Sequence, residues 1–150
     1  MSPHYIPKGY HTVTPYLLVE GATEMIEFLK TVFDATPVMI SHHEDKIGHA
    51  CLQIGDSLIE LADACEEWGQ TSAAIHLYVP DVDATYQKAL EAGAINLREP
   101  SDQFYGERSG SVKDPYGIQW HIATQIEELA NEELLRRAEE FKQQQKQQQQ

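Results

Sequence analysis

The sequence presents the same order of secondary-structure signals twice, with an offset of about 60 residues. Residues 12–19 have strand composition, and in residues 22–33 apolar side chains recur every three or four positions, as on one face of a helix. Strand-like runs follow this helix, at residues 36–41, 49–54 and 57–62. The second copy contains a strand, a helix between Asp81 and Gly93, and three more strands, at residues 73–79, 94–98, 107–113 and 118–124. We therefore predict an α+β fold in which two βαβββ modules form a curved mixed sheet around a cleft.

The repeat also divides the chain. The duplicated domain is predicted to span residues 12–124, with its modules at 12–63 and 73–124, after an N-terminal arm at 1–11. A C-terminal helical extension is expected at 125–142 and a disordered glutamine-rich tail at 143–150, because glutamines provide nothing apolar to bury. The alternative to duplication is that two unrelated α+β halves show the same pattern by coincidence.

Composition and charge exclude several classes of partner. The formal charge is −13, so a nucleic-acid backbone or an anionic membrane surface would repel the chain. No run of about 18 apolar residues is present, and residues 1–10 have no apolar core resembling a secretory signal. The cysteines, Cys51 and Cys65, are too few for a disulfide framework and are interpreted as thiols of a cytoplasmic protein.

Strand alternation places several polar side chains on the sheet face that the helices leave open. His49 and Cys51 alternate with apolar neighbours, and Glu60 and His121 hold matching places in the two modules, with His76 on the same face. Two imidazoles and one carboxylate are a ligand set for Fe(II), Zn or Ni. Glu60, His76 and His121 are therefore candidate metal ligands, and the alternative is that these side chains only line a cleft or a subunit contact.

Other residues are candidates for ligand binding. Trp120 with Tyr16, Tyr105 and Tyr116 can form an aromatic wall, although alternation also places Trp120 in the core. Arg108 can bind a ligand carboxylate or pair with one of the many acids of the chain. Cys51 is either a nucleophile activated by a nearby histidine or a core thiol.

Residues 104–120, FYGERSGSVKDPYGIQW, resemble the PhnB-like branch of the vicinal oxygen chelate superfamily, the glyoxalase and bleomycin-resistance group. Shorter stretches extend this resemblance over roughly residues 12–141, at residues 14–19, 54–57, 61–63, 75–79, 81–83, 91–94 and 122–124. The resemblance implies paired βαβββ modules around a cleft, usually in homodimers. It also places metal-ligand positions at Thr14, Glu60, Ala74 and His121, of which only Glu60 and His121 are suitable ligands.

These observations lead to three functional expectations. The first is a homodimer that binds a small organic molecule in its cleft without a complete metal centre, using Thr14, Tyr16, His49, Cys51 and the ligand-binding candidates above. The second is a glyoxalase-type or dioxygenase enzyme with a divalent metal (Zn, Ni or Fe) on Glu60, His76 and His121. The third is sequestration of a cationic drug, which the net negative charge favours.

Overall fold

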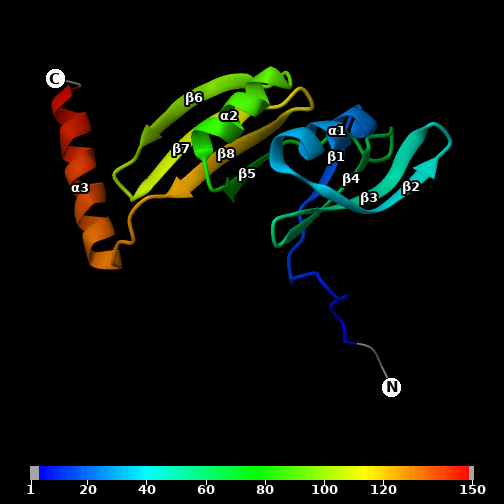
Figure 1. The fold of residues 1–150 in the computed structure, drawn as a ribbon, viewed down its shortest axis with the longest axis horizontal. Coiled ribbons are helices and arrows are strands. Elements are labelled where there is room, and N and C mark those ends of the chain that lie inside the picture. The colour runs from blue at the N-terminus through cyan, green and yellow to red at the C-terminus, as the bar shows by residue number, and fades with distance from the viewer. Residues whose placement is uncertain (1–3, 149–150) are drawn as a thin grey trace.

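The computed structural model describes residues 4–148 and contains two four-stranded sheets, one for each predicted module (Figure 1). The first sheet has the strand order β1-β4-β3-β2, in which β1 is parallel to β4 and the remaining pairs are antiparallel. The elements of this module are β1 (Tyr16–Val19), α1 (Ala22–Phe33), β2 (Thr36–His43), β3 (Lys46–Ile54) and β4 (Ser57–Asp63).

The second sheet repeats this topology, with the strand order β5-β8-β7-β6 and a parallel β5–β8 pair. Its elements are β5 (Ala73–Tyr78), α2 (Val82–Glu91), β6 (Ile95–Asp102), β7 (Glu107–Lys113) and β8 (Ile118–Gln125). The predicted α+β fold with two βαβββ modules is confirmed.

The register of the strands shows how closely the modules correspond. In the first sheet, Glu60 lies opposite Tyr16 on one side and Cys51 on the other. In the second, His121 lies between His76 and Ser111 in the same way. The edge strands β2 and β6 also have register shifts at corresponding places, so the equivalence of Glu60 and His121 that the sequence predicts is confirmed.

Each module uses the end of its last strand to hold the start of its helix. The Asp63 carboxylate accepts hydrogen bonds from the backbone N–H groups of Gly21 and Ala22 at the start of α1, and from Ile47 at 2.7 Å. In the second module, the Thr124 hydroxyl accepts from the N–H of Val82 at the start of α2. These contacts satisfy N–H groups that a helix leaves without an internal partner.

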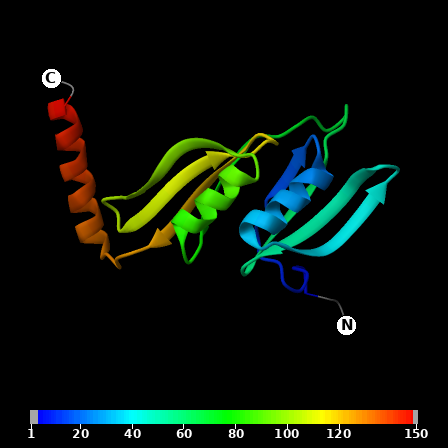
Figure 2. The same ribbon diagram turned by 45° about the horizontal axis from the view of Figure 1, so that its top comes forward.

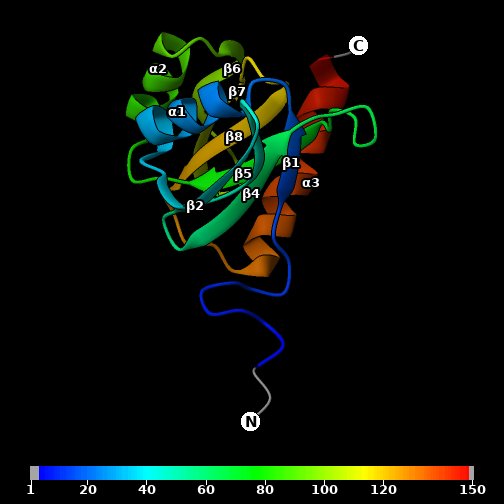
Figure 3. The same cartoon turned by 90° about the vertical axis from the view of Figure 1, so that its right-hand side faces the viewer.

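Helices α1 and α2 contact each other and cover the same side of the two sheets (Figures 2 and 3). A single apolar core runs beneath them and joins the modules. Phe33 of α1 packs on Trp120 of β8, with ring centroids 4.8 Å apart, and Phe28 contacts Tyr116 edge-on. The opposite faces of both sheets are not covered by these helices, and we call them the open faces.

Some boundaries differ from the prediction. The first strand begins at Tyr16 rather than at residue 12, because Pro15 before it has no N–H group to donate to a ladder. Strand β6 continues past Pro100 to Asp102, well beyond the predicted end at residue 98. It lies at the edge of its sheet, where a proline and an irregular register are tolerated.

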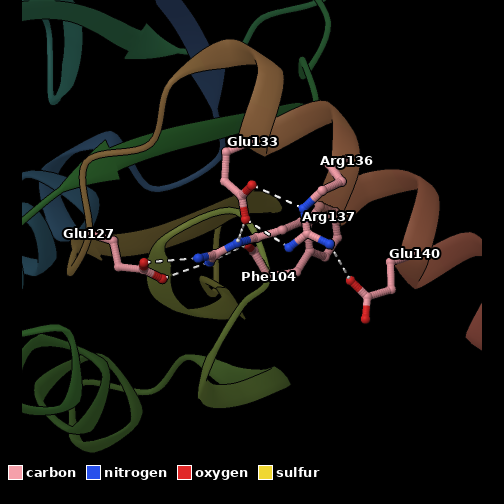
Figure 4. Close-up of polar contacts among 6 residues, drawn as sticks. All are labelled: Phe104, Glu127, Glu133, Arg136, Arg137 and Glu140. Atoms are coloured by element: carbon pink, nitrogen blue, oxygen red, sulfur yellow. Dashed lines mark hydrogen bonds and ion pairs between the residues drawn. The ribbon is translucent and has the colours of Figure 1, made fainter.

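Helix α3 (Asn131–Gln148) lies at one end of the molecule (Figure 1). Arg137 attaches it to the body, because its guanidinium donates to the carbonyl of Phe104 and to the Glu127 carboxylate, besides Glu133 of the same helix (Figure 4). Phe141 stacks on Phe104 with ring centroids 4.8 Å apart. The helix continues to Gln148, so the predicted start of a disordered tail at residue 143 was too early, while residues 149–150 lie outside the described residues. No helix within residues 4–148 is long and apolar enough to cross a membrane.

Candidate functional site

The open face of the first sheet carries a chain of polar side chains. His49 of β3 lies with its Nε2 atom 2.5 Å from a carboxylate oxygen of Glu60 on β4. Its other ring nitrogen is 3.4 Å from the hydroxyl of Tyr16 on β1. Glu60 is thus held by an imidazole of its own module.

Cys51 lies on the same face but is not accessible. Its side chain is only 1% exposed, and its sulfur accepts a hydrogen bond from the hydroxyl of Tyr10 at 3.0 Å. This hydrogen bond, together with burial, raises the pKa of Tyr10 to about 12. Of the two alternatives for Cys51, the structure supports the core thiol, because a nucleophile needs access to its substrate.

The open face of the second sheet carries the two histidines. His76 and His121 are register partners on the parallel strands β5 and β8. His121 is hydrogen-bonded through Nδ1 to the Ser111 hydroxyl at 2.7 Å, and His76 lies 3.7 Å from the Glu107 carboxylate. Burial, and then the nearby charges of Arg98 and His76, hold the pKa of His121 below its usual value, which favours the neutral imidazole at pH 7.

The structure does not bring the predicted metal ligands together within one chain. Glu60 lies on the first sheet with His49, whereas His76 and His121 lie on the second. Among residues 4–148, no three histidine, cysteine or carboxylate side chains are grouped as a metal ion requires. The side chains of residues 4–148 in a single chain therefore do not fit a divalent metal at this place.

A cavity of about 830 Å³ lies where the two modules meet. We call it the junction cavity. Of the predicted site residues, Thr14, His76 and Trp120 line it, together with residues of α1, β3, β5 and α2. Trp120 is 1% exposed and packs in the core, so it is both a core residue and part of the cavity wall.

The remaining predicted ligand-binding residues lie elsewhere. Arg108 forms ion pairs with Asp83 at 2.8 Å and Asp102 at 3.1 Å. Of its two interpretations, the structure supports pairing with acids of the chain. The Tyr105 hydroxyl is 3.4 Å from that of Ser109. Tyr16, as described above, contacts His49 instead of Trp120 and Tyr105, so the structure shows no single aromatic wall.

Several residues of the open faces were missed by the sequence reasoning. Strand alternation in β7 places Glu107, Ser109 and Ser111 on the face of His121, and this signal was available. The position of Arg98 could not be predicted in this way, because a register shift in β6 interrupts the alternation just before it. Tyr10 precedes the first strand, where no periodic pattern indicates its direction.

Comparison with known proteins agrees with this architecture. Residues 9–122 match the sequence profile of the Glyoxalase/Bleomycin resistance protein/Dioxygenase superfamily, and the chain belongs to this superfamily. It is 33% identical to an uncharacterized protein of Mycobacterium bovis over 134 residues, which cover 81% of this chain and 88% of that protein.

Two solved structures show the same fold. TioX from Micromonospora sp. ML1 matches with a TM-score of 0.64 and 21% identity, over 80% of this chain and 100% of that chain. A PhnB protein from Bacillus cereus matches with a TM-score of 0.61 and 18% identity, over 76% of this chain and 99% of that chain.

Proposed function

We propose that this protein is a PhnB-like member of the superfamily that binds a small organic molecule in the junction cavity, and that binding needs no metal ion. The cavity is the observation that carries the proposal. Its volume of about 830 Å³ lies within the range of about 300–1,000 Å³ that is typical of small-molecule sites. The assignment to the PhnB-like branch rests on the sequence of residues 104–120.

The lining of the cavity has the mixed chemistry of a ligand site. Phe33, Ile75 and Trp120 provide apolar and aromatic surface, while Thr14 and His76 provide polar groups that can orient a ligand. His76 also faces His121 across the β5–β8 pair, so a ligand in the cavity can extend to the open face of the second sheet. The cavity and that face are therefore proposed to form one site.

The functional unit is proposed to be a homodimer that covers the open faces. These faces expose large side chains that usually seek burial, with Tyr16, Met39 and Tyr78 exposed by 45%, 44% and 60%. A second copy placed with its second sheet against the first sheet of this chain covers these exposed side chains.

The proposal predicts that filling the junction cavity abolishes binding. Ligand-observed NMR with a fragment library, on protein treated with a chelator, identifies a compound that binds. Thr14→Trp is expected to weaken the affinity for that compound by at least about tenfold, because the indole occupies the space of the ligand.

Thr12→Trp is the matched control, since Thr12 is exposed and does not line the cavity. This variant is expected to keep the affinity of the unaltered protein. Equal binding by both variants, or no binding of any compound to the metal-free protein, would overturn the proposal.

A metal-dependent enzyme is the second candidate, and the adjacent imidazoles of His76 and His121 are the observation that favours it. In a dimer, the partner chain would have to supply the carboxylate. Sequestration of a cationic drug is the third candidate, and it predicts binding that weakens at high salt through loss of attraction to the net negative charge.

A further inference from the structure

The arginines of the chain differ in whether they have an acidic partner. Arg108, Arg136 and Arg137 each form ion pairs with carboxylates. Arg98 does not form an ion pair with any carboxylate of residues 4–148, although the chain carries 24 acidic residues. Its guanidinium donates one hydrogen bond, from Nη2 to the Ser109 hydroxyl at 2.6 Å. A guanidinium has five N–H donors in a planar fork, so most of them are available.

The surroundings of Arg98 are polar and ordered. It lies opposite Ser111 in the register of β6 and β7, and Ser111 is hydrogen-bonded to His121 on the next strand. Ser109 and Ser111 are 1% and 3% exposed, and Ser109 is also 3.4 Å from the Tyr105 hydroxyl. The hydroxyls of Ser109 and Ser111 are therefore already engaged in contacts within the protein.

The backbone is adapted to place this arginine. The register of β6 shifts on both sides of Arg98, so that Pro100 passes close to Gly110 of β7. A side-chain carbon on Gly110 would lie only 3.0 Å from the ring of Pro100. Glycine at this position thus permits the bend of β6 that brings the Arg98 guanidinium over Ser109 and towards His121.

The charges on this face are favourable for an anion. Arg98 contributes a permanent positive charge. Burial lowers the pKa of His121, and the charge of Arg98 lowers it further. Glu107, an acid on the same face, accepts a hydrogen bond from the Tyr78 hydroxyl at 2.6 Å and lies 3.7 Å from His76. In a chain of charge −13, the Arg98 guanidinium is a local positive charge that attracts an oxyanion.

We propose that Arg98, with His121 and Ser111 beside it, binds an oxyanion of the ligand, either a carboxylate or a phosphate group. The planar fork of arginine matches both groups through two parallel hydrogen bonds. This inference rests on the proposed function and extends it, because His76 connects the junction cavity to His121. The ligand would place its apolar part in the cavity and its charged group on Arg98.

Three probes test the inference on the full, chelator-treated chain: propionate, inorganic phosphate and the neutral amide propionamide. NMR titration is expected to show binding of propionate or phosphate and none of propionamide, and the stronger anion identifies the group. Arg98→Gln is expected to weaken that binding by at least about tenfold. Arg98→Lys should recover only part of it, since the charge is kept and the fork is lost.

Arg136→Gln is the matched control, because Arg136 is an exposed arginine of α3 that is already paired with Glu133 and Glu140. It should bind the anion as the unaltered protein does, and circular dichroism should show that all the variants are folded. The inference is overturned if Arg98→Gln binds the anion as tightly as the unaltered protein does, if propionamide binds as tightly as the anion, or if neither anion binds. The proposed function survives any of these results if library compounds still bind in a way that Thr14→Trp abolishes.

Discussion

Replacing Asp114 with alanine is expected to lower the free energy of unfolding by about 4 kcal/mol, the sum of about 1–3 kcal/mol for each buried donor left without a partner. The Asp114 side chain is 4% exposed and accepts from the Trp120 indole N–H at 2.7 Å. It also accepts from the backbone N–H groups of Tyr116 and Ile118. These contacts hold the β7–β8 turn and the tryptophan at the wall of the junction cavity.

Denaturant unfolding followed by circular dichroism measures this loss. Asp56→Ala is the matched control, since Asp56 occupies the exposed turn between β3 and β4 and accepts only from its neighbour Ser57. Its effect should stay within about 0.5 kcal/mol, as is usual for surface positions. A loss below about 1 kcal/mol in Asp114→Ala would mean that water replaces the carboxylate, contrary to the buried contacts described here.

The same carboxylate is expected to make stability depend on pH. Burial, opposed by the hydrogen bonds from Trp120 and the backbone, holds the pKa of Asp114 above its usual value in the folded protein. The stabilisation from this raised pKa is fully present below the unfolded pKa of about 3.9, and it is lost as the pH rises through the folded pKa. The free energy of unfolding, relative to that of Asp114→Asn, should therefore fall on raising the pH from about 4 to 7. A constant or rising difference would contradict this.

Replacing Asp63 with alanine is expected to cost about 2–3 kcal/mol, because one carboxylate there satisfies two N–H groups at the start of α1 and a third in β3. The contacts to Gly21 and Ala22 are 3.2 and 3.0 Å long, and the contact to Ile47 is 2.7 Å. The change removes the connection between the last strand of the first module and both of these elements.

Amide hydrogen exchange, measured beside the unfolding free energy, locates this loss. Protection should decrease in the first turn of α1 and at the start of β3, while the second module, with its own contact from Thr124 to Val82, changes little. Asp45→Ala, in the exposed turn between β2 and β3, is the control. A uniform loss of protection in both modules would contradict the local role of Asp63.

The fold was predictable because its signals are local. Alternating apolar residues define β3, β4 and β8, and Asp81 begins α2 as expected, since its carboxylate accepts from the N–H of Ala84. The duplication appears in the sequence as a constant offset and in the structure as the same register around Glu60 and His121. Faces of strands follow from alternation alone, so the open positions of both residues could also be predicted.

The grouping of the site residues was less predictable, because it depends on distances between elements. Alternation places Glu60, His76 and His121 on open faces, but it does not show that they belong to two different sheets. Hydrogen-bond partners such as His49 and Ser111 are identified only in the structure. Likewise, Arg108 and Arg98 both lie in strands of the second module, and only the structure shows that acids engage the first of them. Sequence patterns predict the face of a strand on which a side chain lies, whereas a binding site depends on distances between strands and modules.

The central claim is that a small molecule binds in the junction cavity without a metal ion, and calorimetry on the compound found by the fragment screen tests it most directly. The dissociation constant is measured before chelator treatment, after it, and after addition of Zn, Ni or Fe(II). The account predicts the same constant, within about twofold, in all of these conditions. Binding that disappears on chelation, returns with one equivalent of metal and is abolished again by Glu60→Ala would contradict it.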